Sequence, residues 1–390
     1  MNQLHLLFLL LPLAALSGWL IGRRGSARTT GRKVSRLSTT YFRGLNYLLN
    51  EQPDKAIEVF LKLAEVDKQT VETHFALGNL FRRRGEVDRA IRVHQNLIAR
   101  PGLTDEQKTQ AMLELGEDYM RAGLLDRAEV LFSDLVKLES SAPQALKHLI
   151  AICQQERDWP KAIEHATRYQ QATGERMGAL IAQFHCEIAE RQRQRGELDT
   201  ARERLAQAFE AEPDCLRAGI IEGQLDIAQG NDQAAIRAFE RVARHDPEML
   251  PEVLDPLLAA YARRDAMHRA GDFLTEMIER HAGVSPLLAL TRIKEAEQGH
   301  AAAVEFLVKQ LRRRPSVRGQ GALIDLSMAD SEPPERDVLQ VLKQLTDQLV
   351  ARAHTHRCGR CGFGARSHHW QCPSCKNWGS VRPVHGPIGE

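Results

Sequence analysis

Residues 75–98 carry apolar and small side chains at the spacing of two short amphipathic helices joined at a glycine. The first set lies on one face of a helix that precedes Gly85, and consists of Leu77, Gly78 and Phe81. The second set lies on one face of a helix that follows this turn, and consists of Ala90, His94 and Leu97. Because glycine has no side chain, Gly78 and Gly116 are predicted to let a neighbouring helix backbone approach closely.

The same pattern of apolar positions returns along the chain. It reappears at Leu115, with Gly116 and Tyr119 before a turn at Gly123 and Phe132 after it. A small residue at the twentieth place of the unit recurs at intervals of 34, 38, 34, 39, 34, 35 and 33 residues. These residues are Ala56, Ala90, Ala128, Ala162, Ala201, Ala235, Ala270 and Ala303. A two-helix unit of this size cannot bury its apolar face alone, so the period predicts stacked units with a continuous core.

This period resembles that of the tetratricopeptide repeat family. The resemblance implies an all-α fold, a superhelical solenoid of about 8–9 units over residues 37–353. A generic all-helical bundle is the alternative. Thr104 is predicted to cap a helix, whereas Pro251 and Pro256 are predicted to disturb the start of one. Residues 331–334 are predicted to be a break before a last helix at 336–353, whose apolar stripe is Val338, Leu342, Leu345 and Leu349.

Charge is distributed unevenly along the chain. Of the 390 residues, 43% are hydrophobic and 5% aromatic, which is enough to bury a large core, and the net charge is only +2. Residues 23–36 nevertheless hold six Lys and Arg and no acid, and residues 352–390 hold six against Glu390 alone. Basic ends therefore flank an acidic array.

The N-terminus carries an apolar run of 18 residues, from Leu4 to Ile21. At about 1.5 Å per residue it is long enough for a bilayer core, so residues 1–22 are predicted to be a transmembrane anchor. Since all nearby positive charge follows the run, residues 23–36 are predicted to be a basic juxtamembrane linker, with the rest of the chain in the cytoplasm. A cleaved signal peptide and an interfacial helix are the alternatives.

Residues 354–390 form a cysteine-rich tail. Cys358 and Cys361 make one C-x-x-C pair, and Cys372 and Cys375 make a second after ten residues. Each pair can turn both sulfurs toward one ion, so the four thiolates are predicted to hold one metal in a closed tetrahedral shell with a structural role. Disulfides and a redox-active dithiol are the alternatives.

The two pairs, with Gly362 after the second cysteine, resemble the metal knuckles of rubredoxins. The resemblance implies iron as the ion, but the spacer is shorter than in a rubredoxin, so zinc is the alternative. Together, the anchor, the repeats with Leu77 to Ile91, and the tail around Trp370 and Trp378 resemble the lipopolysaccharide assembly protein B family of Gram-negative bacteria. The similarity covers essentially the whole chain.

The resemblance implies a single-pass protein of the bacterial inner membrane that regulates lipopolysaccharide synthesis. It implies that FtsH, a membrane protease, and LpxC, the deacetylase that FtsH degrades, are partners. Other lipopolysaccharide-synthesis or transport proteins and a second copy of this chain are further partners consistent with it. A scaffold for another inner-membrane complex, a redox carrier, and a nucleic-acid binder that uses the basic tail are the alternative functions.

The remaining polar and sulfur side chains are predicted to have structural roles. Cys153, Cys186 and Cys215 stand singly and are interpreted as small buried hydrophobic residues. His74, His94 and His185 are interpreted as core or rim residues, and Arg82–Arg84 and Arg312–Arg314 as solvated helix ends. Four histidines lie nearer the cysteines, but four thiolates already suffice for a metal, so a ligand role is only the alternative for them: His354, His356, His368 and His369. Trp370 and Trp378 are predicted to cover the knuckles or to pack against the array. The sequence has no phosphate loop, nucleophile–base pair or acidic dyad at catalytic spacing, so we predict no enzyme.

Overall fold

The computed structural model describes residues 30–50, 52–66, 71–138, 142–280, 283–387 and 389–390, and these residues contain 18 α-helices and a small sheet. The chain divides into two compact units. Unit 1 comprises residues up to Arg157 and also 171–173, and unit 2 comprises 158–170 and 174–390. No helix in the described ranges is both long enough and apolar enough to cross a membrane. The predicted span of residues 1–22 lies outside these ranges.

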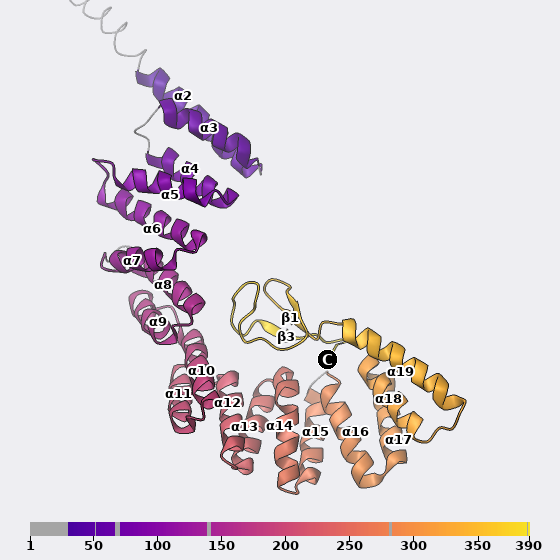
Figure 1. The fold of residues 1–390 in the computed structure, drawn as a ribbon. Helices are drawn as coiled ribbons and strands as arrows, with labels where there is room; N and C mark the ends of the chain where they lie inside the picture. Colours follow the sequence, from indigo (N-terminus) through magenta and orange to yellow (C-terminus); the bar gives the residue numbers. More distant parts are fainter. Residues whose placement is uncertain (1–29, 51, 67–70, 139–141, 281–282, 388) are drawn as a thin grey trace, which may run out of the picture. The chain divides into compact units, whose positions relative to one another are not determined.

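Unit 1 is a stack of antiparallel helix pairs (Figure 1). Each pair packs internally, and its second helix also packs against the first helix of the next pair, as in tetratricopeptide repeats. Its helices are α2 (Thr30–Leu49), α3 (Pro53–Val66), α4 (Val71–Arg84), α5 (Val87–Ile98), α6 (Asp105–Ala122), α7 (Leu125–Val136) and α8 (Ala142–Glu156). Helix α2 begins inside the predicted linker. The segment contains no proline to stop a helix, so the seven residues from Thr30 to Arg36 are helical instead.

Unit 2 continues the same arrangement and ends in the tail. Its helices are α9 (Trp159–Thr173), α10 (Gly178–Gln194), α11 (Leu198–Ala211), α12 (Leu216–Ala228), α13 (Asp232–His245), α14 (Leu250–Arg263), α15 (Met267–Arg280), α16 (Ser285–Gln298), α17 (His300–Arg313), α18 (Val317–Ala329) and α19 (Glu335–Arg352). The last three residues of α9 group with unit 1. A 3₁₀ turn, Pro247–Met249, leads into α14.

Two predictions about helix boundaries have different outcomes. Thr104 caps α6 as predicted, since its hydroxyl accepts the N–H of Gln107, whose side chain in turn accepts the N–H of Thr104. The prediction for Pro256 is wrong, because α14 runs through this residue. Pro251 lies in the first turn of α14, where a backbone N–H has no partner within the helix, so the missing N–H of proline costs no hydrogen bond.

The last helix, α19, packs on α18 with only Thr346 fully buried. The four apolar residues of the predicted stripe are exposed, with Val338 at 61% and Leu349 at 56% of their full accessibility.

The periodic alanines form the tightest contacts of the repeats. All eight of them, from Ala56 to Ala303, have no accessible surface. A larger residue at any of these places would push two helices apart, because protein interiors contain few voids. The sequence period therefore predicted the core correctly.

Side-chain rings, and not helix backbones, pack against the glycines of α4 and α6. A Cβ atom at Gly78 would lie 2.3 Å from His94, and one at Gly116 would lie 2.5 Å from the ring of Phe132. The predicted approach of a helix backbone at Gly78 and Gly116 is therefore wrong, and a side-chain ring of the partner helix fills the space at both. Phe132 cannot move aside easily, since it is fully buried and stacked on His148 at 4.6 Å.

We expect Gly116→Ala to destabilise the protein by about 1–3 kcal/mol, although alanine is normally the better helix former. The matched control is Gly271→Ala in α15, where the added Cβ would meet nothing nearer than 3.8 Å. This control is expected to stabilise the protein by about 0.5–1 kcal/mol. Urea unfolding followed by circular dichroism measures the change in the free energy of unfolding for both variants. A change of the same sign in both would contradict the contact between the ring and Gly116.

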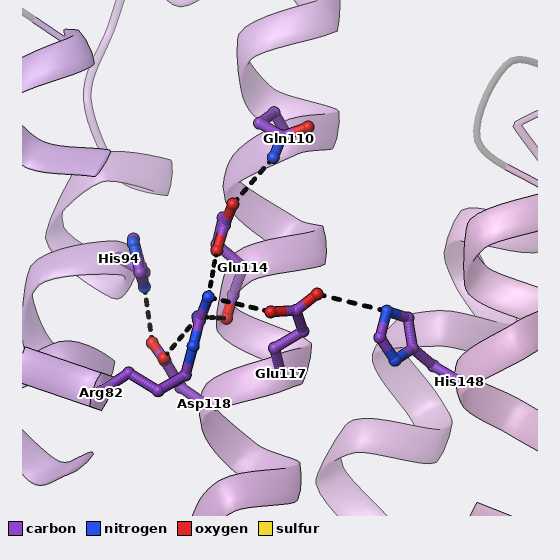
Figure 2. A network of polar contacts seen from close by, with 7 residues as sticks. All are labelled: Arg82, His94, Gln110, Glu114, Glu117, Asp118 and His148. Carbon is purple, nitrogen blue, oxygen red and sulfur yellow. Dashed lines mark hydrogen bonds and ion pairs between the residues drawn. The ribbon is translucent and has the colours of Figure 1, made fainter. Parts of the chain in front are cut away.

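A polar network joins three successive repeats of unit 1 (Figure 2). The Arg82 guanidinium contacts Glu114 at 2.6 Å, Glu117 at 2.9 Å and Asp118 at 2.8 Å, all on α6. Asp118 also accepts a hydrogen bond from the ring of His94 at 2.5 Å, and both side chains are fully buried. The interpretation of Arg82 as a solvated helix end is therefore wrong, whereas Arg83 and Arg84 are exposed as predicted.

The network extends to α8 through Glu117 and His148, which lie 3.3 Å apart. The hydrogen bond with His148 and the charge of Arg82 hold the pKa of the Glu117 carboxyl below its ordinary value. Glu117 therefore contributes stability above its ordinary pKa of about 4.5, and this contribution is lost as the pH falls through the lowered value.

Candidate metal centre

The tail folds into a three-stranded antiparallel sheet. Its strands are β1 (His356–Cys358), β2 (Gly364–Ala365) and β3 (Val381–Pro383), in the order β2, β1, β3. Cys358 pairs with Val381 at the end of β1, and both residues are buried. The sheet thus places the first C-x-x-C pair at the end of its central strand.

The two C-x-x-C pairs share one backbone design. The N–H of the first cysteine donates to the carbonyl five residues later, at 2.8 Å in both pairs: Cys358 to Phe363, and Cys372 to Asn377. The N–H of the residue after the second cysteine donates to the carbonyl of the first cysteine, at 2.9 Å in both pairs. That residue is Gly362 in one pair and Lys376 in the other, with left-handed φ angles of +77° and +58°. Only the first is visible in the sequence as a turn residue.

The four cysteine sulfurs converge on one point. All four Sγ atoms lie within 4.8 Å of one another. Cys358 and Cys375 are 3.7 Å apart, as are Cys361 and Cys372. In a tetrahedral site with metal–sulfur bonds of about 2.3 Å, the sulfurs are about 3.8 Å apart, so the residues fit one thiolate-bound ion. Four protein ligands leave no open position, which favours a structural role.

The surroundings of the first pair favour the thiolate form. The Ser380 hydroxyl lies 3.3 Å from Cys358 Sγ and, with the Cys361 N–H, lowers the pKa of the Cys358 thiol to about 6. The N–H of Phe363 lowers the pKa of the Cys361 thiol. Because a metal binds the thiolate, these groups reduce the competition from protons.

Polar contacts hold the tail against α14 and the 3₁₀ turn before it. His356 Nε2 lies 3.0 Å from a carboxylate oxygen of Glu252 at the start of α14. Arg382 on β3 donates to Asp246 at 2.5 Å, next to the 3₁₀ turn. His385 lies 3.5 Å from Glu248 in that turn. Basic groups of the tail therefore meet acidic groups of the array, in agreement with the charge asymmetry of the sequence.

Aromatic side chains make the second part of this contact. The Trp378 ring lies edge-on to Trp159 and to Phe184 of α10, with centroids 6.1 Å apart in both cases. The Arg217 guanidinium of α12 lies 5.6 Å from the ring of Trp370 and 5.7 Å from that of Trp378. Arg217 is itself held by Glu187 at 2.7 Å and is 6% exposed. Of the two alternatives predicted for these tryptophans, packing against the array is confirmed.

The end of the tail contacts α16 and α18. Glu390 accepts the N–H of Ser285 at 3.0 Å and pairs with Arg318, and the Pro387 carbonyl accepts the N–H of Val317 at 2.6 Å. The tail is thus fixed to the first helices of several repeats.

The histidines near the knuckles have other roles than metal binding. Within the described residues, the cluster able to hold an ion consists of the four cysteines, without His354, His356, His368 or His369. His368 packs edge-on against Trp370, with centroids 4.5 Å apart. Burial lowers its pKa to about 4, which leaves the ring neutral at pH 7. Sequence reasoning missed Arg217, Asp246 and Glu252, because the tail residues that they contact lie more than a hundred residues away along the chain.

Trp378→Ala is expected to loosen the tail while leaving its metal bound. The substitution leaves all four cysteines in place. It removes the contacts to Trp159, Phe184 and Arg217, so we expect a loss of about 2–3 kcal/mol of docking free energy. The matched control is Arg366→Ala, whose side chain is exposed in the same tail. Faster proteolysis of the tail in the first variant only, at equal metal content, is the expected result; an equal rate would contradict the docking role of Trp378.

Stacked helix pairs with a docked four-thiolate ribbon define a tetratricopeptide-repeat protein with a metal-binding tail. Residues 356–383 match the rubredoxin metal binding domain, and residues 73–107, 113–176 and 186–249 match tetratricopeptide repeat families. A solved tetratricopeptide-repeat protein from Cytophaga hutchinsonii aligns over 68% of this chain and 93% of its own, at 14% identity and a TM-score of 0.36.

Two curated relatives match the whole chain. Lipopolysaccharide assembly protein B of Escherichia coli K12 is 38% identical over 388 residues, which cover 99% of this chain and 100% of the relative. The protein of the same name from Haemophilus influenzae is 33% identical and covers 98% of both chains. The chain belongs to the lipopolysaccharide assembly protein B family.

Proposed function

We propose that this protein is an adaptor in lipopolysaccharide assembly and that it works at the bacterial inner membrane. The observation that carries the proposal is the full-length identity of 38% to lipopolysaccharide assembly protein B of Escherichia coli. Stacked helix pairs are typical of proteins that bind other proteins over an extended surface. The closed four-thiolate shell supports a role in binding and architecture over one in catalysis.

In this proposal, the apolar run Leu4–Ile21 anchors the chain and the repeats recruit clients beside the membrane. The finer mechanism is that the clients are FtsH and LpxC, so that the protein promotes degradation of the deacetylase and limits lipid A synthesis. Tethering supports this mechanism because confinement to a membrane raises the effective concentration of one partner near another. The tail would fix the relative positions of the repeats that it contacts.

Nucleic-acid binding by the basic tail is a weaker alternative. Such binding requires cations free to contact phosphates. Arg382, His356 and His385 are instead directed at Asp246, Glu252 and Glu248 of the same unit. Acidic residues of the array thus pair with some of the tail's basic side chains, which are then not free to contact phosphates.

Cross-linking in membranes followed by affinity purification tests the adaptor role. We expect FtsH and LpxC to be recovered with the full chain. A variant without residues 1–22 is expected to fold but to lose recovery of both and to leave LpxC long-lived in cells. The matched control replaces Leu4–Ile21 by an unrelated single-span helix and is expected to retain both. Normal LpxC turnover with the truncated variant would overturn the role of the anchor, and absence of both partners from the full chain would overturn the mechanism.

Iron is the ion that we propose for the four-thiolate site, with zinc as the alternative. The support is the similarity of residues 356–383 to the rubredoxin metal binding domain. Four thiolates suit both ions. An absorption spectrum of the purified protein separates them, because ferric thiolate is red and zinc thiolate is colourless.

A further inference from the structure

Two cysteines that stand far apart in the sequence lie in contact inside unit 2. Cys186 of α10 and Cys215, immediately before α12, are 29 residues apart, and their sulfurs are 3.9 Å apart. Both are buried in the apolar core, as is Cys153, so their interpretation as small buried residues is confirmed, but the sequence did not predict that two of them are in contact. A disulfide bond is about 2.05 Å long, so closing it requires a movement of about 2 Å, shared between two side chains.

The two thiols have different environments. Cys215 occupies the N-cap position of α12 and is 6% exposed, whereas Cys186 has no accessible surface. The Cys186 thiol and the first-turn N–H groups of Ala218 and Arg217 lower the pKa of Cys215 to about 7, despite its burial. Contact with Cys215 and burial raise the pKa of Cys186. The N–H groups at the start of α12 thus favour Cys215 as the nucleophile of the pair.

Small molecules can reach Cys215. It lines a cavity of about 170 Å³ between the array and the tail, together with Arg217, Trp370 and Arg382. It also lines a second cavity of about 50 Å³ beside Arg241 and His245. A water molecule occupies about 30 Å³ in the liquid, so the larger cavity admits a hydroperoxide as small as hydrogen peroxide.

We propose that Cys186 and Cys215 are a peroxide-sensitive dithiol beneath the docked tail, in which Cys215 is the attacking residue and Cys186 the resolving one. The proposal rests on the contact between the sulfurs, the position of Cys215 at a helix N-terminus and the cavity that it lines. It is independent of the four metal-binding cysteines and of the proposed adaptor role.

The chemistry balances with hydrogen peroxide as the oxidant. The Cys215 thiolate attacks one peroxide oxygen, the O–O bond breaks, and the leaving hydroxide takes up a proton to become water. The Cys186 sulfur then attacks the sulfenic acid sulfur of Cys215, the S–O bond breaks, and the hydroxyl leaves as water with the Cys186 proton. Two thiols are oxidised to one disulfide, and one peroxide is reduced to two waters. An external dithiol reverses the reaction.

The test uses the metal-loaded full chain, treated with hydrogen peroxide at pH 7, quenched by alkylation under denaturing conditions and mapped by peptide mass. We expect a cross-linked peptide that contains Cys186 and Cys215. Cys153 is the internal control, because it is also buried, at 1% exposure, and belongs to unit 1. We expect Cys215 to be modified about tenfold faster than Cys153, because Cys215 lies at a helix N-terminus and lines a cavity, whereas Cys153 lies within α8.

Two variants separate the roles of the thiols. In Cys186→Ala, a sulfenic acid on Cys215 is expected to persist long enough to be trapped by a 1,3-diketone probe. In Cys215→Ala, Cys186 is expected to stay reduced. A wild-type map in which Cys186 and Cys215 both remain alkylatable, or in which Cys215 is oxidised no faster than Cys153, would overturn the proposal, and this result requires no variant to fold.

Discussion

Replacing Arg82 with alanine is expected to destabilise unit 1 by about 3–5 kcal/mol. The reason is the set of carboxylates that the guanidinium holds together. Asp118 has no exposed side-chain surface and Glu114 has 13%, so their charges would remain buried without their cation. Arg82→Lys is expected to lose less stability than Arg82→Ala but still to be less stable than the unmodified protein. An ammonium keeps the positive charge but cannot make the fork of hydrogen bonds that three carboxylates accept.

Urea unfolding followed by circular dichroism, with hydrogen exchange of α4 and α6, measures this effect. Arg83→Ala is the matched control, because this neighbouring arginine is exposed on the same helix. A triple variant, Arg82→Met with Glu114→Gln and Asp118→Asn, is expected to recover most of the lost stability, since it removes the unpaired charges. Equal unfolding midpoints for Arg82→Ala and Arg83→Ala would refute the role of the network.

The contrast between these arginines shows what the sequence can predict. Arg82, Arg83 and Arg84 are adjacent and chemically identical, and only the first faces α6. The period that identified the repeats depends on contacts that recur in every unit, such as the buried alanines. The Arg82 network occurs once and depends on acids more than thirty residues away, so no local pattern reveals it.

The tail shows the same limit at larger distance. The C-x-x-C spacing predicted which four sulfurs come together, because each pair is bent by a local turn. The surface that receives the tail was not predictable. His356 meets Glu252 across 104 residues and Arg382 meets Asp246 across 136, through single contacts that have no sequence period. The pair Cys186 and Cys215 was missed for the same reason.

Cys372→Ser is expected to remove the metal and unfold the tail. The ribbon's own core consists of Cys358, Cys372 and Val381, with Phe363 and Cys375 packed against them. Two of the three fully buried members are predicted metal ligands, so little apolar area remains to hold the strands without the ion. Structural zinc sites of this kind contribute about 10–16 kcal/mol of binding free energy to folding. Losing one of four thiolates therefore removes the main source of the tail's stability.

Elemental analysis and limited proteolysis of the full chain measure this loss. We expect metal content to fall from about one ion per chain to less than about a tenth, and cleavage to appear between β1 and β3. Ser374→Ala is the control, because Ser374 is exposed in the same knuckle. Docking should fail together with folding: the strands position His356, Arg382 and Trp378, so their contacts to α10, α14 and the 3₁₀ turn require the intact ribbon. A Cys372→Ser protein that keeps its ion and resists protease as the control does would refute the four-thiolate site.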